Sequence, residues 1–113
     1  MLSINALKEF GANVEEGLAR CLNDEDFYLK LVKKAADSTD FDLLKTAVEQ
    51  KDYKTAFETA HSIKGVFGNL SVTPIYEPTA QITELLRADT DTDYTELLGS
   101  IIKNGNKLKE LCK

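Results

Sequence analysis

The chain has 113 residues, of which 42% are hydrophobic and 29% charged, with a formal net charge of −5. These values are typical of one folded domain with its own core and argue against intrinsic disorder. The acidic balance argues against nucleic acid and membrane surfaces as partners. The longest uninterrupted apolar run, Phe27 to Leu29, is too short for a membrane helix or a signal peptide, so we expect a cytoplasmic location. We therefore expect Cys21 and Cys112 to be reduced thiols.

Apolar residues recur at three- and four-residue steps along nearly the whole chain, and no run alternates with the period of a strand. In chain order, this spacing predicts helices over residues 3–10, 14–22, 25–37, 41–50, 53–70, 73–88 and 94–111. Residues 25–50 could also form one bent helix. Short connections favour antiparallel neighbours, so we expect one all-α domain over residues 1–113: an up-down antiparallel four-helix bundle with additional short N-terminal helices.

Several predicted helices are preceded by residues that commonly cap helix N-termini. These residues are Asp24, Asp52, Thr73 and Asp93. Thr73 is followed directly by a proline, which predicts a cap and then proline at the first helical position. Pro78 is harder to place, because proline lacks an amide hydrogen and clashes with the carbonyl group four residues earlier. We expect a distorted first turn there, or a helix start shifted toward Pro78.

The segment 53–70 has the most continuous apolar stripe and carries His61, the only histidine of the chain. At about 100° per residue, His61 lies more than about 120° from the middle of that stripe, so its side chain should point to solvent. Gly65 and Gly68 lie on the same face as His61, although each glycine costs a helix about 1 kcal/mol relative to alanine. Two glycines beside the only histidine indicate that another group approaches the backbone here.

Neutral imidazole is a nucleophile at physiological pH. A phosphoryl group on His61 would carry close to two negative charges, which Lys64, one turn away, would screen. Phe57 and Lys54 occupy neighbouring helical positions and predict a docking patch with an apolar centre and a charged rim. The same residues also fit an ordinary solvated face, and the glycines also fit close packing between helices.

Residues Ala60 to Leu70 read as a small residue, His, two residues, Lys-Gly, two residues and Gly-Asn-Leu. This segment resembles the signature of histidine-containing phosphotransfer (HPt) domains, and helix order and spacing extend the resemblance over residues 13–112. The resemblance implies an α-helical bundle whose histidine, here His61, is phosphorylated at Nε2 by exchange with an aspartate of a receiver domain. It also implies that Lys64 faces the phosphate and that Gly65 leaves space beside the ring.

On this resemblance we expect a phosphorelay intermediate of two-component signalling. It would be a phosphocarrier and not an enzyme, since the sequence has no nucleotide-binding glycine pattern. The expected partners are response-regulator receiver domains and a hybrid sensor histidine kinase. No cofactor of its own is expected, because Mg²⁺ would come with the receiver domain. We expect a monomeric, free-standing carrier and not a segment of a chemotaxis-type kinase.

The sequence departs from the family pattern at several positions. Ser71 stands where the family often has glycine, and Val66 and Phe67 are bulkier than the usual small pair. Phe67 belongs to the apolar stripe, so we interpret it as a packing variant. Because Pro78 puts the geometry of segment 73–88 in doubt, no polar phosphate ligand is assigned to that segment.

Two other functions are compatible with parts of the sequence. A non-catalytic helical adaptor would dock a receiver or another signalling partner around Phe57 and Val66, but it would have no need for His61. Glu58 and His61 have the Glu-x-x-His spacing of di-iron bundles, which require two such motifs. One histidine cannot supply them within a single chain, so phosphotransfer at His61 is the favoured hypothesis.

Overall fold

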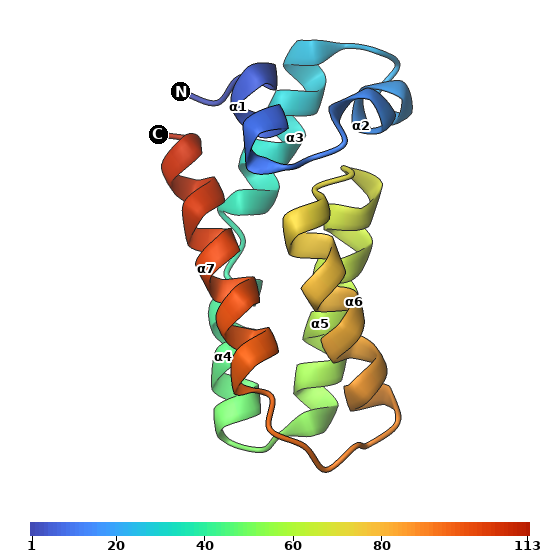
Figure 1. Ribbon diagram of the computed structural model, residues 1–113, viewed down its shortest axis with the longest axis vertical. Coiled ribbons are helices and arrows are strands. Elements are labelled where there is room, and N and C mark those ends of the chain that lie inside the picture. The colour runs from blue at the N-terminus through green and yellow to red at the C-terminus, as the bar shows by residue number, and fades with distance from the viewer.

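The computed structural model describes all 113 residues and contains seven helices and no strand (Figure 1). The helices are α1 (Ile4–Phe10), α2 (Val14–Arg20), α3 (Glu25–Ala36), α4 (Asp40–Glu49), α5 (Tyr53–Asn69), α6 (Thr73–Arg87) and α7 (Thr95–Leu111). Every predicted helix is present within two residues of its expected bounds. Helices α4 to α7 form an up-down antiparallel bundle, which confirms the predicted fold class. None of the helices is long and apolar enough to cross a membrane.

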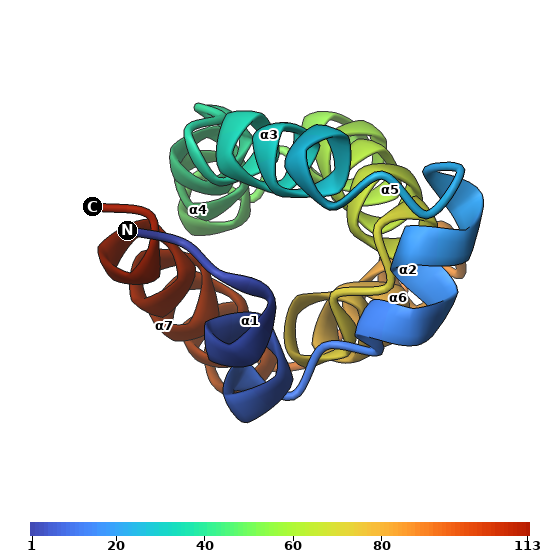
Figure 2. The same ribbon diagram turned by 90° about the horizontal axis from the view of Figure 1, so that it is seen from above.

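The three N-terminal helices lie over one end of this bundle. Helix α3 stacks on the end of α4, and α1 and α2 close the end of the bundle from which Figure 2 is viewed. Helices α3 and α4 are separate, because residues 37–39 are not helical. In this connection the Ser38 hydroxyl accepts a hydrogen bond from the Asp40 amide at 3.1 Å. The alternative of one bent helix over 25–50 is therefore wrong.

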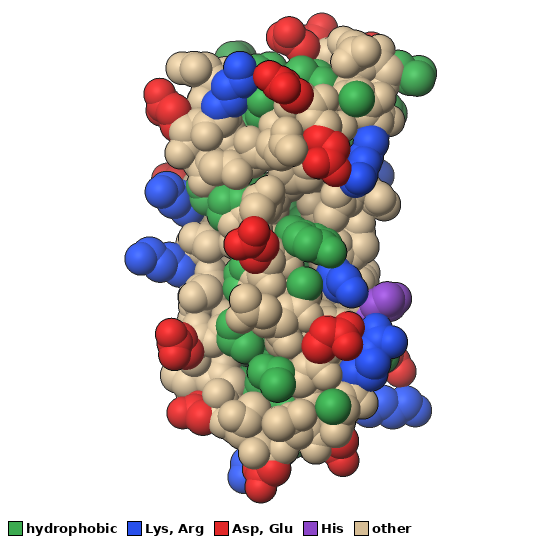
Figure 3. Space-filling model, turned by 45° about the vertical axis from the view of Figure 1, so that its right-hand side comes forward, with side chains coloured by type: hydrophobic (Ala, Val, Ile, Leu, Met, Phe, Trp, Pro, Cys, Tyr) green, Lys and Arg blue, Asp and Glu red, His purple; other side chains and the backbone are tan.

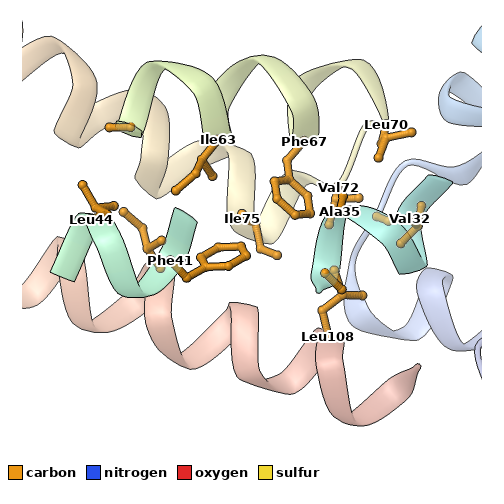
Figure 4. Close-up of a cluster of buried hydrophobic side chains, with 14 of the residues drawn as sticks. Val32, Ala35, Phe41, Leu44, Ile63, Phe67, Leu70, Val72, Ile75 and Leu108 are labelled. Atoms are coloured by element: carbon orange, nitrogen blue, oxygen red, sulfur yellow. The ribbon is translucent and has the colours of Figure 1, made fainter. Parts of the chain in front are cut away.

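The core is a single cluster of apolar side chains from all seven helices and their connections, while charged side chains are spread over the surface in Figure 3. In its centre, Phe41 of α4 packs against Phe67 of α5 with ring centroids 5.6 Å apart (Figure 4). Phe67 is 1% exposed, as expected for a packing variant on the apolar stripe. The core therefore fixes the rotation of α5 about its axis, and with it the face that α5 presents to solvent.

Two predicted N-caps are confirmed, and two others differ. Asp24 and Asp52 each accept a hydrogen bond from the amide three residues later, at 3.1 and 3.3 Å. Helix α6 is capped by Val72 instead of Thr73. Asp93 accepts from the amide of Thr95, the first residue of α7, at 2.9 Å, and Tyr94 instead of Asp93 occupies the cap position. The two cysteines are free, as expected.

The C-terminal end of α5 is held by side chains from the N-terminal helices. The last carbonyl groups of a helix lack partners within it. Here the Tyr28 hydroxyl of α3 donates to the Leu70 carbonyl at 2.7 Å, and the Arg20 guanidinium of α2 donates to the Gly68 carbonyl at 2.7 Å. Gly17 allows α2 to lie close to Tyr28 and Leu70, since a Cβ atom there would lie 2.6 Å from the Tyr28 ring and 2.7 Å from the Leu70 oxygen.

Burial raises the pKa of Tyr28 to about 12, with a smaller contribution from negative charge on Cys21. An unfolded tyrosine ionises near pH 10, so the stability that Tyr28 contributes is complete below about pH 10. It is lost as the pH rises from about 10 to about 12, by about 2–3 kcal/mol. Because burial also raises the pKa of Tyr94 and of Cys112, both chains should lose stability between pH 9 and pH 12. We expect urea unfolding to show a loss larger by about 2–3 kcal/mol in the natural chain than in Tyr28→Phe. An equal loss in both chains would contradict the assignment to Tyr28.

Helix α6 runs without interruption through Pro78, so the expected shift of its start is wrong. Pro78 has no amide hydrogen for the carbonyl group of Pro74, four residues earlier. The side-chain amide of Asn104 on α7 donates to this oxygen at 2.9 Å instead. A tertiary hydrogen bond therefore replaces the helical one that the proline removes.

Replacing Asn104 by alanine is expected to destabilise the fold by about 1–2 kcal/mol, because the partly buried Pro74 oxygen loses its donor. In a Pro78→Ala background the cost should become small, since the amide of residue 78 can then donate to the same oxygen. Urea unfolding of the two single variants and the double variant measures this difference. An equal cost of Asn104→Ala in both backgrounds would show that the Pro74 contact contributes nothing.

Candidate functional site around His61

Helix α5 places His61 on its solvent face. The buried side of the helix is formed by Ala56, Ala60, Ile63 and Phe67, which point into the bundle. His61 lies on the opposite side and is exposed, as its spacing from the stripe predicts. In Figure 3 its imidazole stands out from the surface and has basic side chains beside it. The ring is therefore accessible to a second macromolecule.

The imidazole of His61 rests against an aromatic ring. Phe57, one turn earlier, lies nearly parallel to it, with ring centroids 6.0 Å apart and an angle of 12° between the planes. The Arg87 guanidinium of α6 lies 5.4 Å from the centre of the same phenyl ring. Phe57 itself is half-buried and packs on the edge of the core. It can therefore orient the imidazole while part of its own surface stays open.

A small charged network lies next to the histidine. Lys64, one turn after His61, has its Nζ atom 4.0 Å from Oε1 of Glu84 on α6. The same carboxylate oxygen is 3.6 Å from Nε of Arg87. Two positive charges and one negative charge thus lie on the α5–α6 side of the site.

The two glycines near His61 differ in their surroundings. A Cβ atom on Gly65 would meet nothing within 4 Å, so Gly65 leaves open space. A Cβ atom on Gly68 would lie 2.9 Å from the ring of Tyr76 on α6, so the space at Gly68 is filled by packing. Both glycines are predicted to give space, and in the structure only Gly65 has open space where a Cβ atom would stand. The alternative prediction, that the glycines permit close packing between helices, is correct for Gly68.

An open groove of about 540 Å³ runs along α5 on the C-terminal side of His61. Its walls include Lys64 and Gly65 of α5, Arg20 of α2 and Tyr76 of α6. Phe57 and the exposed Lys54 are not part of this groove and lie on the N-terminal side of the histidine. The predicted site residues therefore divide into a groove on one side of His61 and an aromatic support on the other.

The residues near the site that sequence reasoning missed include Arg20, Tyr76, Glu84 and Arg87. Three of them belong to α6, the segment to which no ligand was assigned because of Pro78. The spacing of Glu84 and Arg87 at three residues, on the helix after the histidine, is the one signal that could have pointed to this pair. Nothing in the spacing of residues predicts the position of Arg20.

Comparison with protein families matches residues 34–112 to the Hpt domain. The matched segment is more than two thirds of the chain and includes α4 to α7 with His61. It leaves out α1, α2 and most of α3. No curated protein and no solved structure matches the chain significantly.

Proposed function

Because the chain belongs to the Hpt domain family, whose members take part in histidine phosphotransfer in two-component signalling, we propose that it is a phosphorelay intermediate. His61 accepts a phosphoryl group from the aspartate of one receiver domain and passes it to another. The observation that carries this proposal is that the only histidine of the chain is exposed on the matched bundle, beside an open groove.

The transfer is an in-line displacement at phosphorus. The lone pair of His61 Nε2 forms the P–N bond as the acyl phosphate P–O bond breaks, and the aspartate carboxylate leaves. Positioning and charge neutralisation dominate such reactions. The receiver would bring Mg²⁺, which neutralises charge on the transferring group. This chain contributes the nucleophile and its support on Phe57, while Gly65 leaves room for the phosphoryl group. The positive charge of Lys64 stabilises the phosphorylated product once the P–N bond has formed.

Label transfer from phosphorylated receiver domains tests the proposal. The chain is mixed with each labelled receiver from the same source, and acid-labile, base-stable label on the chain is followed over time. Rapid transfer from at least one receiver is expected for the natural chain, and none for His61→Gln. Label that persists in His61→Gln would contradict the proposal, as would the absence of transfer from every receiver.

Phe57→Ala is expected to weaken receiver docking while the fold survives. Loss of the half-buried ring should cost about 1–2 kcal/mol of stability, below the value for a fully buried phenylalanine. It also removes the support of the imidazole and the apolar centre of the patch, so the receiver concentration for half-maximal transfer should rise about tenfold.

Phe10→Ala is the matched control, because Phe10 is also half-buried and has a cation, Lys107 Nζ, 5.8 Å from its ring centre. Phe10 lies on α1, away from the histidine. The two variants should lose similar stability, and only Phe57→Ala should change transfer. Collapse of helicity in Phe57→Ala would show instead that Phe57 is a core residue.

A further inference from the structure

The lysine next to His61 is already engaged by a carboxylate. Glu84 Oε1 lies 4.0 Å from Lys64 Nζ and 3.6 Å from Arg87 Nε, so one oxygen faces two cations. Figure 3 shows an acidic side chain among basic ones next to the imidazole. The Lys64 side chain is 27% exposed, against 62% for Glu84, so the lysine is the more confined partner. Lys64 therefore lies against α6 while His61 carries no phosphoryl group.

We propose that Glu84 is a positioning residue that holds Lys64 on α6 and releases it when His61 is phosphorylated. This inference rests on the proposed function. A phosphohistidine one turn from Lys64 would carry close to two negative charges, against one on Glu84, and would attract the ammonium group more strongly. Arg87 stays with Glu84 after the exchange, so the carboxylate keeps a partner. Glu84 thus competes with the phosphoryl group for Lys64 and shortens the lifetime of the phosphohistidine.

The mechanism by which phosphohistidine is hydrolysed decides whether freeing Lys64 lengthens or shortens its lifetime. A water oxygen bonds to phosphorus as the P–Nε2 bond breaks, the imidazole recovers its nitrogen lone pair, and inorganic phosphate leaves. The transition state is loose and resembles metaphosphate, with less negative charge on its oxygens than the dianionic ground state. A cation beside the phosphoryl group therefore stabilises the ground state more and slows its loss. Freeing Lys64 from Glu84 should lengthen the lifetime.

The test uses phosphoramidate as the donor, so that no receiver is needed. His61 Nε2 displaces ammonia and takes the phosphoryl group, the donor is removed, and intact mass gives the half-life of the phosphorylated chain. We expect Glu84→Gln to lengthen the half-life about two- to fivefold, the range that corresponds to a measured exposed ion pair. The melting temperature of the unphosphorylated chain should stay within about 3 °C, as for most surface substitutions.

Two comparisons separate this role from a general effect of charge. Glu58→Gln removes the same charge one turn before His61, from a residue that makes no ion pair in the structure. Its effect on the half-life should be smaller and should be the same in a Lys64→Ala background. The effect of Glu84→Gln should disappear in that background, because Lys64 transmits it.

Equal effects of Glu84→Gln and Glu58→Gln, or an effect of Glu84→Gln that persists without Lys64, would overturn the inference. Neither result would contradict the proposed function, which label transfer from receiver domains tests separately. If neither phosphoramidate nor any receiver places a phosphoryl group on His61, the proposed function and this inference fail together.

Discussion

Replacing Gly65 by glutamine is expected to slow phosphoryl transfer at least about 100-fold and to leave the fold intact, since small displacements of reacting groups have effects of this size. A Cβ atom at residue 65 meets nothing within 4 Å, so the folded chain accepts a side chain without a clash. Glutamine also forms helices better than glycine. Its side chain would, however, stand in the open space beside His61 where, on the proposed function, the phosphoryl group and the receiver would enter.

Two further variants make this result specific. Gly65→Ala should raise stability by up to about 1 kcal/mol and should change the transfer rate much less. Gly99 also borders open space within a helix, α7, and lies outside the groove beside His61. Gly99→Gln should therefore match the gain in helix stability without affecting transfer. Urea unfolding and label transfer are measured for all three variants, and a destabilising Gly65→Ala would show that Gly65 is a packing contact.

Replacing Gly17 by alanine is expected to lower the stability by about 2–3 kcal/mol, the upper part of the range for overpacking a close contact. The new methyl group would lie 2.7 Å from the Leu70 carbonyl oxygen and 2.6 Å from the Tyr28 ring, and so α2 would have to move away. This movement would also strain the hydrogen bonds that Arg20 and Tyr28 make to the end of α5.

Urea unfolding of Gly17→Ala, with Gly65→Ala as its counterpart, measures this effect. The same substitution should lower the stability at Gly17 and raise it at Gly65, because only Gly17 is in close contact with another segment. Stabilisation by Gly17→Ala would contradict the close approach of α2 to Tyr28 and Leu70. Slower phosphoryl transfer in the folded variant would show in addition that α2 helps to position α5.

The helices could be predicted from the sequence because each has a regular apolar stripe, and burial of that stripe decides its conformation. Pro78 shows where this reasoning fails. A proline inside a helix is predicted to disturb it, but the donor that satisfies Pro74 comes from Asn104 on another helix. Such a compensation depends on how α6 packs against α7, and local spacing carries no information about it.

The candidate site likewise has some features that local spacing predicts and others that depend on how the helices pack. The exposure of His61 follows from its angle to the stripe of α5, and it was predicted correctly. Gly65 and Gly68 look equivalent in the sequence, but Tyr76 packs against one of them and leaves the other open. Arg20 and Glu84 reach the site only because α2 and α6 lie beside α5, so their positions depend on tertiary structure.

Because His61 is stacked on Phe57, its imidazole signals can be used as an NMR probe of the site. His61 is the only histidine, so its Hε1 and Hδ2 protons give the only imidazole signals in the proton NMR spectrum of an untagged sample. The nearly parallel phenyl ring adds a ring-current shift to those two signals. A phosphoryl group on Nε2 changes them through the bond, whereas a partner that lifts the imidazole off Phe57 removes the ring-current shift. Modification and docking can therefore be followed separately, in the same sample and without isotope labelling.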